Sequence, residues 1–290
     1  MSADRQSVLD LWHVLGAADE LVPNQPKRTQ LLDEPLHVCL NDEGIEVWRA
    51  DDPQRAPLPV SHAFGYFWTC LGEPKTPLFS IPEFDEPDRR NLNAATVGVH
   101  VSAPRAIENF LDMGHFPFVH TGILGVEPHT EVKEYQVQVT NGELLATECR
   151  FFQPMAAATS SGGADVEYIY RVPHPYCSVL YKSSGADASR MDVIALFVQP
   201  VSEERCQASM LLCLIDEVHG NAEMRDFQLT IFGQDKPILE NQIPKKLPLT
   251  PSSEVPIRAD GASVTYRRWL GEQGVRYGVI PTVETTGAAP

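Results

Sequence analysis

The chain has 290 residues, of which 43% are hydrophobic and 21% charged, and these proportions are ordinary for a globular protein with a full core. Its formal charge of −16 argues against nucleic acid or an anionic membrane as a partner, because either requires a basic surface. No stretch reads as a secretory signal or approaches the roughly 20 apolar residues of a spanning helix, so we expect a cytoplasmic protein.

The first 90 residues are expected to form a small β region followed by an irregular connection. Residues 5–20 suggest a short helix, and QLLDEPLHVCL and GIEVWRAD predict strands joined by a turn at 41–44. GYFWTCL predicts a further strand inside a proline-rich stretch, and residues 72–90 are interpreted as a linker.

From residue 91 onwards the pattern predicts an α+β fold. ATVGVHVSA indicates a strand, and APRAIENFLDMGHF indicates a helix. Several alternating segments between residues 130 and 218, separated by turn sequences such as SSGGAD and SSGADAS, predict a large antiparallel sheet. Two final helices are expected over NAEMRDFQLTIFGQDKPILENQIP and YRRWLGEQ, so that helix covers one face of a curved sheet.

The stretch ENFLDMGHFPFVH, residues 108–120, carries the strongest chemical signal. Two histidines with one carboxylate are typical of the facial ligand set of non-heme Fe(II) oxygenases. On a regular helix, His115 and His120 would point about 140° apart, and we expect Pro117 to break or kink the helix so that both can face one metal. Asp112 then either orients His115 or is itself a ligand. The alternative is a pair of packed, hydrogen-bonded histidines on an aromatic face.

The spacing N-x-x-D-x-x-H-x-x-x-x-H resembles the iron-binding helix of the Rieske-type non-heme iron oxygenases. The downstream stretch IFGQDKPILENQ, with Asp235, Glu240 and Gln242, is similar to the helix that supplies this family's third ligand. The resemblance implies iron ligands at His115, His120 and Asp235. It also implies that Asp112 bridges a ligand histidine to an electron donor, and that Asn109 lies near the metal.

The family's iron–sulfur domain is represented here only by its flanks. RTQLLDEPLHVCL and GYFWTCLGEP resemble its opening and closing strands, but the insert with C-x-H and C-x-x-H cluster ligands is missing. His37-x-Cys39 resembles the C-x-H ligand motif, but its two residues are in the reverse order. The six cysteines form no CxxC or CxH pair, so we interpret them as buried free thiols. We therefore expect no [2Fe–2S] cluster. We therefore expect a truncated remnant of this domain plus a linker over 1–90, a mononuclear iron domain over 91–280 and a tail over 281–290.

This architecture is similar to the methylxanthine N-demethylase branch of the family. The resemblance implies one Fe(II) per chain, O₂ as co-substrate, and hydroxylation of an N-methyl group with loss of formaldehyde, with 7-methylxanthine as the expected substrate and xanthine as the product. No nucleotide-binding GxGxxG is present. The implied partners are a Rieske-containing NADH reductase and a glutathione-transferase-like structural subunit. Relatives form trimers, although the missing cluster removes one reason for that assembly.

Two alternatives remain at this level. The iron site could serve an O-demethylase or a ring hydroxylase of another aromatic substrate, or the chain could be a non-catalytic structural subunit of an oxygenase complex. The pocket is expected to be mostly apolar. Phe232, one turn before Asp235, is a candidate for substrate binding.

Overall fold

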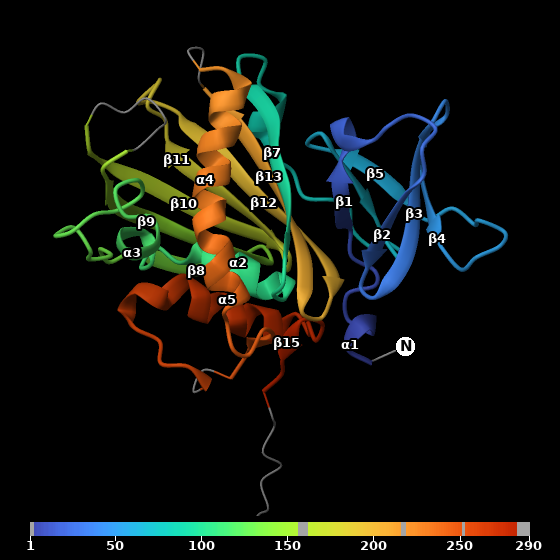
Figure 1. Ribbon diagram of the computed structural model, residues 1–290. Helices are drawn as coiled ribbons and strands as arrows, with labels where there is room; N and C mark the ends of the chain where they lie inside the picture. The colour runs from blue at the N-terminus through green and yellow to red at the C-terminus, as the bar shows by residue number, and fades with distance from the viewer. Residues whose placement is uncertain (1–2, 156–161, 216–218, 251–252, 283–290) are drawn as a thin grey trace, which may run out of the picture.

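The computed structural model describes residues 3–155, 162–215, 219–250 and 253–282. A small β region near the N-terminus lies beside a large sheet, and helix α4 runs along the face of that sheet away from the β region (Figure 1). The predicted α+β fold, with a large antiparallel sheet and C-terminal helices, is confirmed. None of the described helices is long and apolar enough to cross a bilayer.

The large sheet has seven antiparallel strands in the order β7-β13-β12-β11-β10-β9-β8. Its strands are β7 (Arg90–Val99), β8 (Gln136–Thr140), β9 (Glu143–Gln153), β10 (Ala164–His174), β11 (Cys177–Ser183), β12 (Met191–Ser202) and β13 (Arg205–Leu214). The hairpin turn at SSGADAS follows the predicted turn chemistry, whereas the turn between His174 and Cys177 was not predicted and separates β10 from β11. Residues 160 and 161 of SSGGAD, residues 216–218 of the last predicted strand and most of the tail lie outside the described residues.

The N-terminal region contains two three-stranded sheets, ordered β1-β6-β5 and β2-β3-β4. The strands are β1 (His13–Ala17), β2 (Lys27–Leu31), β3 (Glu34–Asn41), β4 (Gly44–Arg49), β5 (Val60–Ala63) and β6 (Tyr66–Thr69). The helix expected over 5–20 was wrong beyond its first turn, since α1 covers Ala3–Gln6. All five residues of β1 are buried and pair with β6, so tertiary strand pairing overrides the local helical pattern.

Alternation along the central strands gives the large sheet two different buried faces. On one face Val179, Ala195 and Phe197 pack against Tyr66 and Trp68 of β6. On the other face the intervening residues, Leu180, Ile194, Leu196, Met210 and Leu212, lie beneath α4. The sheet is therefore anchored to the N-terminal region on one side and free to form a cavity on the other.

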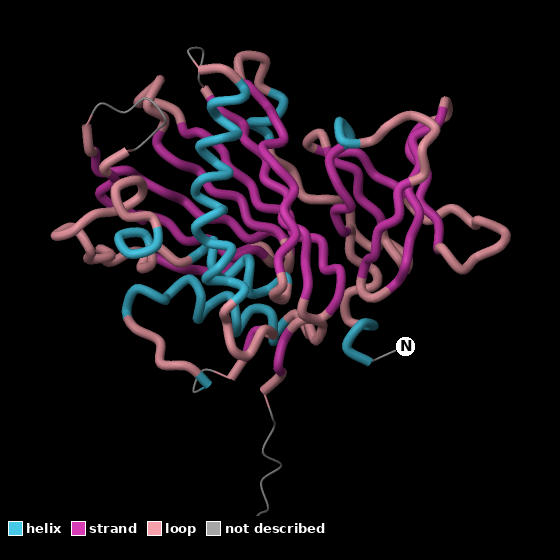
Figure 2. Tube along the Cα trace, in the orientation of Figure 1, coloured by secondary structure: helices cyan, strands magenta, loops and turns pink. Residues whose placement is uncertain are grey.

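The helices gather at the open face of the large sheet (Figure 2). They are α2 (Ala103–Leu111), α3 (Phe116–Val119), α4 (Asn221–Glu240) and α5 (Gly261–Glu272), and a two-stranded parallel pair, β14 (Leu247–Pro248) with β15 (Val279–Ile280), closes the chain. Single-turn 3-10 helices lie at Ala18–Glu20, Pro82–Asp85 and Arg258–Asp260.

The break between the two histidines differs from the expected one. Helix α2 ends at Leu111, before either histidine, with Asp112 at its C-cap. Pro117 lies in the first turn of the separate helix α3, which follows His115 as its N-cap. Proline favours this position because its fixed φ suits a helix start and its missing N–H would have no partner there. Pro117 therefore starts a new helix rather than kinking an old one.

Candidate metal centre

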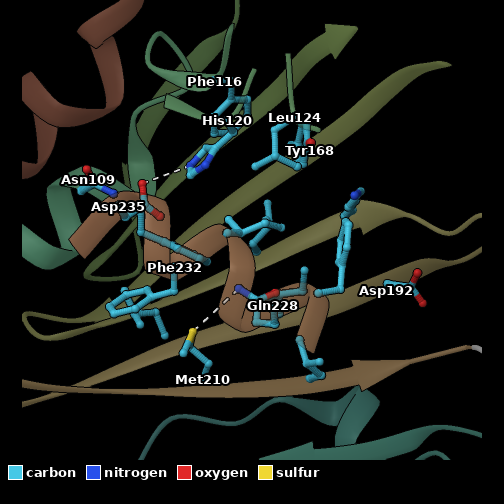
Figure 3. A pocket seen from close by; sticks show the side chains of 18 of the residues that line it. Asn109, Phe116, His120, Leu124, Tyr168, Asp192, Met210, Gln228, Phe232 and Asp235 are labelled. Atoms are coloured by element: carbon cyan, nitrogen blue, oxygen red, sulfur yellow. Dashed lines mark hydrogen bonds and ion pairs between the residues drawn. The ribbon is translucent and has the colours of Figure 1, made fainter. Parts of the chain in front are cut away.

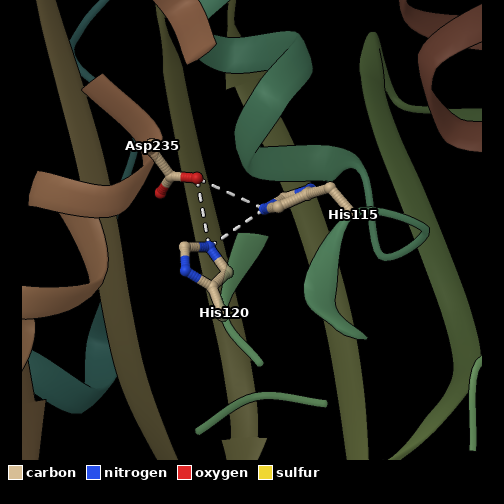
Figure 4. A group of neighbouring side chains, drawn as sticks. All are labelled: His115, His120 and Asp235. Carbon is tan, nitrogen blue, oxygen red and sulfur yellow. Dashed lines mark hydrogen bonds and ion pairs between the residues drawn. The ribbon is translucent and has the colours of Figure 1, made fainter. Parts of the chain in front are cut away.

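Three side chains from two parts of the chain converge at the inner face of α4. His115 and His120 flank the single-turn helix α3, and Asp235 projects from the fourth turn of α4 (Figure 4). The distances are 3.1 Å from His115 Nε2 to His120 Nε2, 3.3 Å from His115 Nε2 to Asp235 Oδ1 and 3.0 Å from His120 Nε2 to Asp235 Oδ1. Among the described residues, these form the one group of three or more potential ligands whose atoms converge.

The outer nitrogen of each imidazole contacts an oxygen acceptor. His115 Nδ1 lies 3.2 Å from Asp112 Oδ2, and His120 Nδ1 lies 2.8 Å from Gln234 Oε1. Because these oxygens only accept, each Nδ1 carries a proton. In the neutral imidazoles, both Nε2 atoms then direct lone pairs at one another and at the carboxylate.

This arrangement fits a divalent metal. Asp235 Oδ1 is buried and accepts no hydrogen bond of normal geometry, although it lies close to both nitrogens. With metal–ligand bonds of about 2.1 Å, adjacent octahedral positions are about 3.0 Å apart, close to the observed spacings. Two imidazoles and one carboxylate suit iron of the facial type, and imidazoles held by outer acceptors are typical of metal ligands. The predicted ligand set is thus brought together as a candidate mononuclear site.

The pKa values follow from the same contacts. Burial alone would lower the pKa of His115, but its hydrogen bond to Asp112 and its close contact with the carboxylate of Asp235 raise it to about 9. Burial would raise the pKa of Asp235, but its contacts with His115 and His120 lower it to about 2. A proton on the imidazole pair thus occupies the charge position that a cation would fill, and metal binding would displace it.

Asp112 and Asn109 lie at the boundary between this centre and a second hollow. Asp112 Oδ1 accepts the Gly114 N–H at 2.6 Å, its other oxygen accepts from His115, and the side chain is 31% exposed. Its exposed side borders a hollow of about 200 Å³, and Asn109 lines both this hollow and the cavity at the metal centre. Asp112 therefore connects the imidazole of the candidate ligand His115 to the surface.

A charged cluster forms the floor of this second hollow. Arg105 contacts Glu254 at 2.6 Å and Glu108 at 3.1 Å, and Arg267 contacts both acids. Burial would raise the pKa of Glu254, but the two arginines lower it to about 2. The cluster ties α2 to α5 beneath Asp112.

The cavity at the candidate metal centre, about 150 Å³, lies between α4 and the open face of the sheet (Figure 3). His115, His120 and Asp235 close one end, and Phe232 lies on its wall as expected. Most of the lining is apolar. Gln228, with its amide Nε2 3.8 Å from Met210 Sδ, is the polar group in the middle of the α4 wall.

Glu240 and Gln242, quoted with Asp235 in the downstream stretch but not predicted as ligands, lie away from the converging atoms. Glu240 accepts the backbone N–H of His100 at 3.0 Å, and Gln242 lines the second hollow, so neither joins the converging ligands. Gln234 was missed, because consecutive helical residues point about 100° apart and no period links it to His120. Five of the six cysteines are buried and Cys39 is partly exposed, and all six are free.

Comparison with known proteins defines the class of this chain. Residues 99–274 match the vanillate O-demethylase oxygenase C-terminal domain. This match covers more than half of the chain, which therefore belongs to the catalytic-domain family of the Rieske oxygenases.

Within that class the similarity is to methylxanthine demethylases. The chain is 42% identical over 280 residues to the probable methylxanthine N7-demethylase NdmC of Pseudomonas sp. (strain TJI-51), covering 96% of this chain and 99% of that protein. It is 28% identical over 193 residues to the methylxanthine N3-demethylase NdmB of Pseudomonas putida, covering 66% of this chain and 52% of that protein. The fold matches NdmA of Pseudomonas putida CBB5 with caffeine at a TM-score of 0.75 and 20% identity, covering 99% and 100% of the two chains. Dicamba monooxygenase bound to dicamba matches at a TM-score of 0.72 and 16% identity, over 92% and 97%.

Proposed function

We propose that the chain is an oxygenase component that hydroxylates the N7-methyl group of 7-methylxanthine, which then releases formaldehyde and leaves xanthine. The observation that carries the proposal is the convergence of three metal-ligand lone pairs at the end of an apolar cavity. The 42% identity to a probable N7-demethylase supports the choice of methyl group.

The overall reaction balances with one O₂ and one NADH for each methyl group. One oxygen atom enters the methyl group and leaves in formaldehyde, and the other becomes water with the two electrons and two protons supplied. A bound Fe(II) at His115, His120 and Asp235 would supply the O₂ activation. The hydroxymethyl product on nitrogen then collapses by breaking its C–N bond, and the proton from its hydroxyl passes to the ring nitrogen.

The residues of this chain bind and orient the substrate. The apolar walls hold a planar ring, with Phe232 one turn of α4 from the ligand Asp235. The Gln228 amide offers a donor and an acceptor to the polar atoms of the ring. The same walls exclude water from the reacting methyl group.

We propose that the two electrons come from NADH through a separate reductase that carries a Rieske cluster. Asp112 suits the entry point, because one carboxylate oxygen holds the ligand His115 while the side chain is partly exposed at the second hollow. The hollow offers a surface at which such a donor can approach within a short distance of the metal.

The test combines iron analysis with turnover. After anaerobic reconstitution we expect about one iron per chain, and formaldehyde release from 7-methylxanthine only when NADH and a Rieske-containing reductase are both present. His120→Ala should lose both iron and turnover.

A panel of methylxanthines and methoxybenzoates identifies the substrate class. Turnover of methoxybenzoates and failure on every N-methyl purine would replace the proposal with O-demethylation, which the vanillate O-demethylase family match makes the second candidate. Substoichiometric iron after reconstitution would instead favour a structural subunit.

A further inference from the structure

Two buried histidines meet where the N-terminal region contacts the large sheet. His13 begins β1 and is 1% exposed, and His174 ends β10 and is 8% exposed. Their ring centres are 5.9 Å apart with the ring planes at 86°, and the ring of Tyr176 contacts both. Because β1 belongs to the N-terminal region and β10 to the large sheet, the pair connects the two (Figure 1).

The hydrogen bonds of the two rings indicate which nitrogen of each carries the proton. His13 Nε2 lies 2.8 Å from the carbonyl oxygen of Val8, which only accepts, so Nε2 donates and Nδ1 is left as an acceptor. His174 Nδ1 accepts the backbone N–H of Tyr176 at 3.0 Å, so its proton is on Nε2, which is left as a donor. Both remaining atoms, His13 Nδ1 and His174 Nε2, are buried and have no hydrogen-bond partner in the described part of the chain.

The two unpartnered atoms are complementary, since one is an acceptor and the other a donor. A small rotation of the rings, or one bridging water, would let His174 Nε2 donate to His13 Nδ1 and would satisfy both atoms. An added proton destroys this match. On His13 it creates a second donor beside the donor of His174, and on His174 it removes the acceptor of the Tyr176 N–H. The contact therefore requires both imidazoles to be neutral.

The side chains around the pair do not supply a negative charge that would stabilise an imidazolium. The titratable groups on the neighbouring elements are Cys70 after β6, Tyr176 in the turn after β10 and Tyr266 of α5. Burial raises the pKa of all three, so each is uncharged at neutral pH. Glu203 adds to the rise at Tyr176, and Glu108 contributes at Tyr266. The charged residues of the segment before β1 are already in ion pairs, Arg5 with Glu34 and Asp10 with Lys75.

Burial therefore decides the protonation of both imidazoles. It lowers the pKa of His13 from 6.5 to about 4, although the Val8 carbonyl opposes part of the change. It also lowers the pKa of His174, and the neighbouring His13 lowers it further. Because each pKa is below its ordinary value while the contact is closed, the opened state binds protons more readily and acid favours opening.

The pair lies where three parts of the chain meet. The Tyr176 hydroxyl donates to the carbonyl oxygen of Tyr277 at 3.0 Å, and the Arg276 N–H donates to Ser7 Oγ at 3.0 Å. Opening of the pair would loosen the N-terminal segment, β1 and residues 276–277 together. The seven-stranded sheet would keep its own strand pairs, because β1 pairs with β6 and not with that sheet.

We propose that the His13–His174 pair is a proton-sensitive joint, which holds β1 against the large sheet while both imidazoles are neutral and releases it on acidification. Release of β1 precedes unfolding of the large sheet. The inference is independent of the proposed function, since neither histidine lines the cavity or belongs to the candidate metal centre.

The test compares amide hydrogen exchange in β1 and in β12 of the full chain at about pH 7.5 and about pH 5.5, with exchange times corrected for the intrinsic effect of pH. A histidine with a pKa of 6.5 in the opened state and about 4 in the closed state increases opening about tenfold over this range. With two such histidines, the protection of β1 should fall about a hundredfold, and that of β12 less than about threefold.

Glutamine variants separate this effect from general acid destabilisation, because an amide keeps a donor and an acceptor but gains no proton in this range. His13→Gln and His174→Gln should each reduce the fall in β1 protection to about tenfold, and the double variant to less than about threefold. His62→Gln makes the same change at an exposed histidine of β5, in the same region, and should retain the wild-type fall.

Two results would overturn the inference. One is a fall in β1 protection that is the same in the wild type and in the glutamine variants. The other is a wild type in which β1 and β12 lose protection in parallel, or in which β1 loses none. If His13→Gln does not fold, His174→Gln removes the other proton-binding group, and the wild-type comparison of β1 with β12 needs no variant.

Discussion

Gln234 holds the buried ligand His120 in the form that can bind a metal. Its Oε1 accepts the Nδ1 proton at 2.8 Å, which leaves Nε2 free to face Asp235. His120 is 1% exposed, so water cannot replace this acceptor if it is removed. In Gln234→Leu the buried Nδ1–H of His120 loses its hydrogen-bond acceptor, which costs about 1–3 kcal/mol of stability. The proton can instead move to Nε2, where it prevents that nitrogen from binding a metal. Either outcome should weaken metal binding by about ten- to a hundredfold.

The assay is an anaerobic Fe(II) titration of Gln234→Leu against a competing chelator, with circular dichroism to verify the fold. Gln234→Glu keeps an acceptor oxygen at the same position and should retain most of the affinity. Gln242→Leu makes the matched change at the second hollow and should bind like the wild type. If folded Gln234→Leu binds Fe(II) within about twofold of wild type, the hydrogen bond does not control the tautomer and the reasoning fails.

Three further predictions follow from neighbouring features. A Cβ at Gly125 would lie 2.6 Å from the backbone nitrogen of Pro117, so Gly125→Ala should displace α3. We expect the variant to have a lower melting temperature and a lower Fe(II) affinity. An unchanged Fe(II) titration would show that α3 can shift without moving the two histidines that flank it. Asp112→Asn should keep iron and substrate binding but slow NADH-driven formaldehyde release at least about tenfold, and a parallel loss of iron would refute the electron-entry role. Glu254 has its pKa lowered from 4.5 to about 2, so its ion pairs stabilise the fold above pH 4.5 and are lost as the pH falls towards 2; Glu254→Gln should flatten the decline of melting temperature in that window, and an unchanged decline would contradict this.

Much of the fold could be predicted because hydrophobic and polar residues alternate along a strand that is buried on one face. In the strand Glu143–Gln153, buried residues alternate with more exposed ones over most of the length, as expected for the alternating segments between residues 130 and 218. His13–Ala17 was mispredicted because all five residues are buried, so the strand lacks any alternation to reveal it. Its conformation depends on pairing with Tyr66–Thr69, more than 45 residues away in the sequence.

Part of the candidate site could be predicted from residues that are close together in the sequence, and the rest is assembled only by the fold. His115, His120 and Asp112 lie within nine residues, so their proximity and the break near Pro117 could be anticipated from helix geometry. Asp235 was found through family resemblance, since no local rule connects it to the two histidines that flank α3. Gln234 was not found, because a glutamine beside a candidate ligand looks like an ordinary surface residue in the sequence.

Helix α4 links the two ends of the cavity. Its Asp235 and Gln234 supply one candidate ligand and the acceptor for another, so the candidate metal centre is fixed to this helix even though His115 and His120 lie at the two ends of α3. Its first turn contacts β7, where Arg90 Nη1 lies 4.0 Å from Met224 Sδ. The wall of the cavity opposite the sheet is therefore one 20-residue helix rather than a set of loops. A rigid helix that also carries Asp235 gives a reason why this cavity should discriminate substrates by length, in addition to their apolar surface.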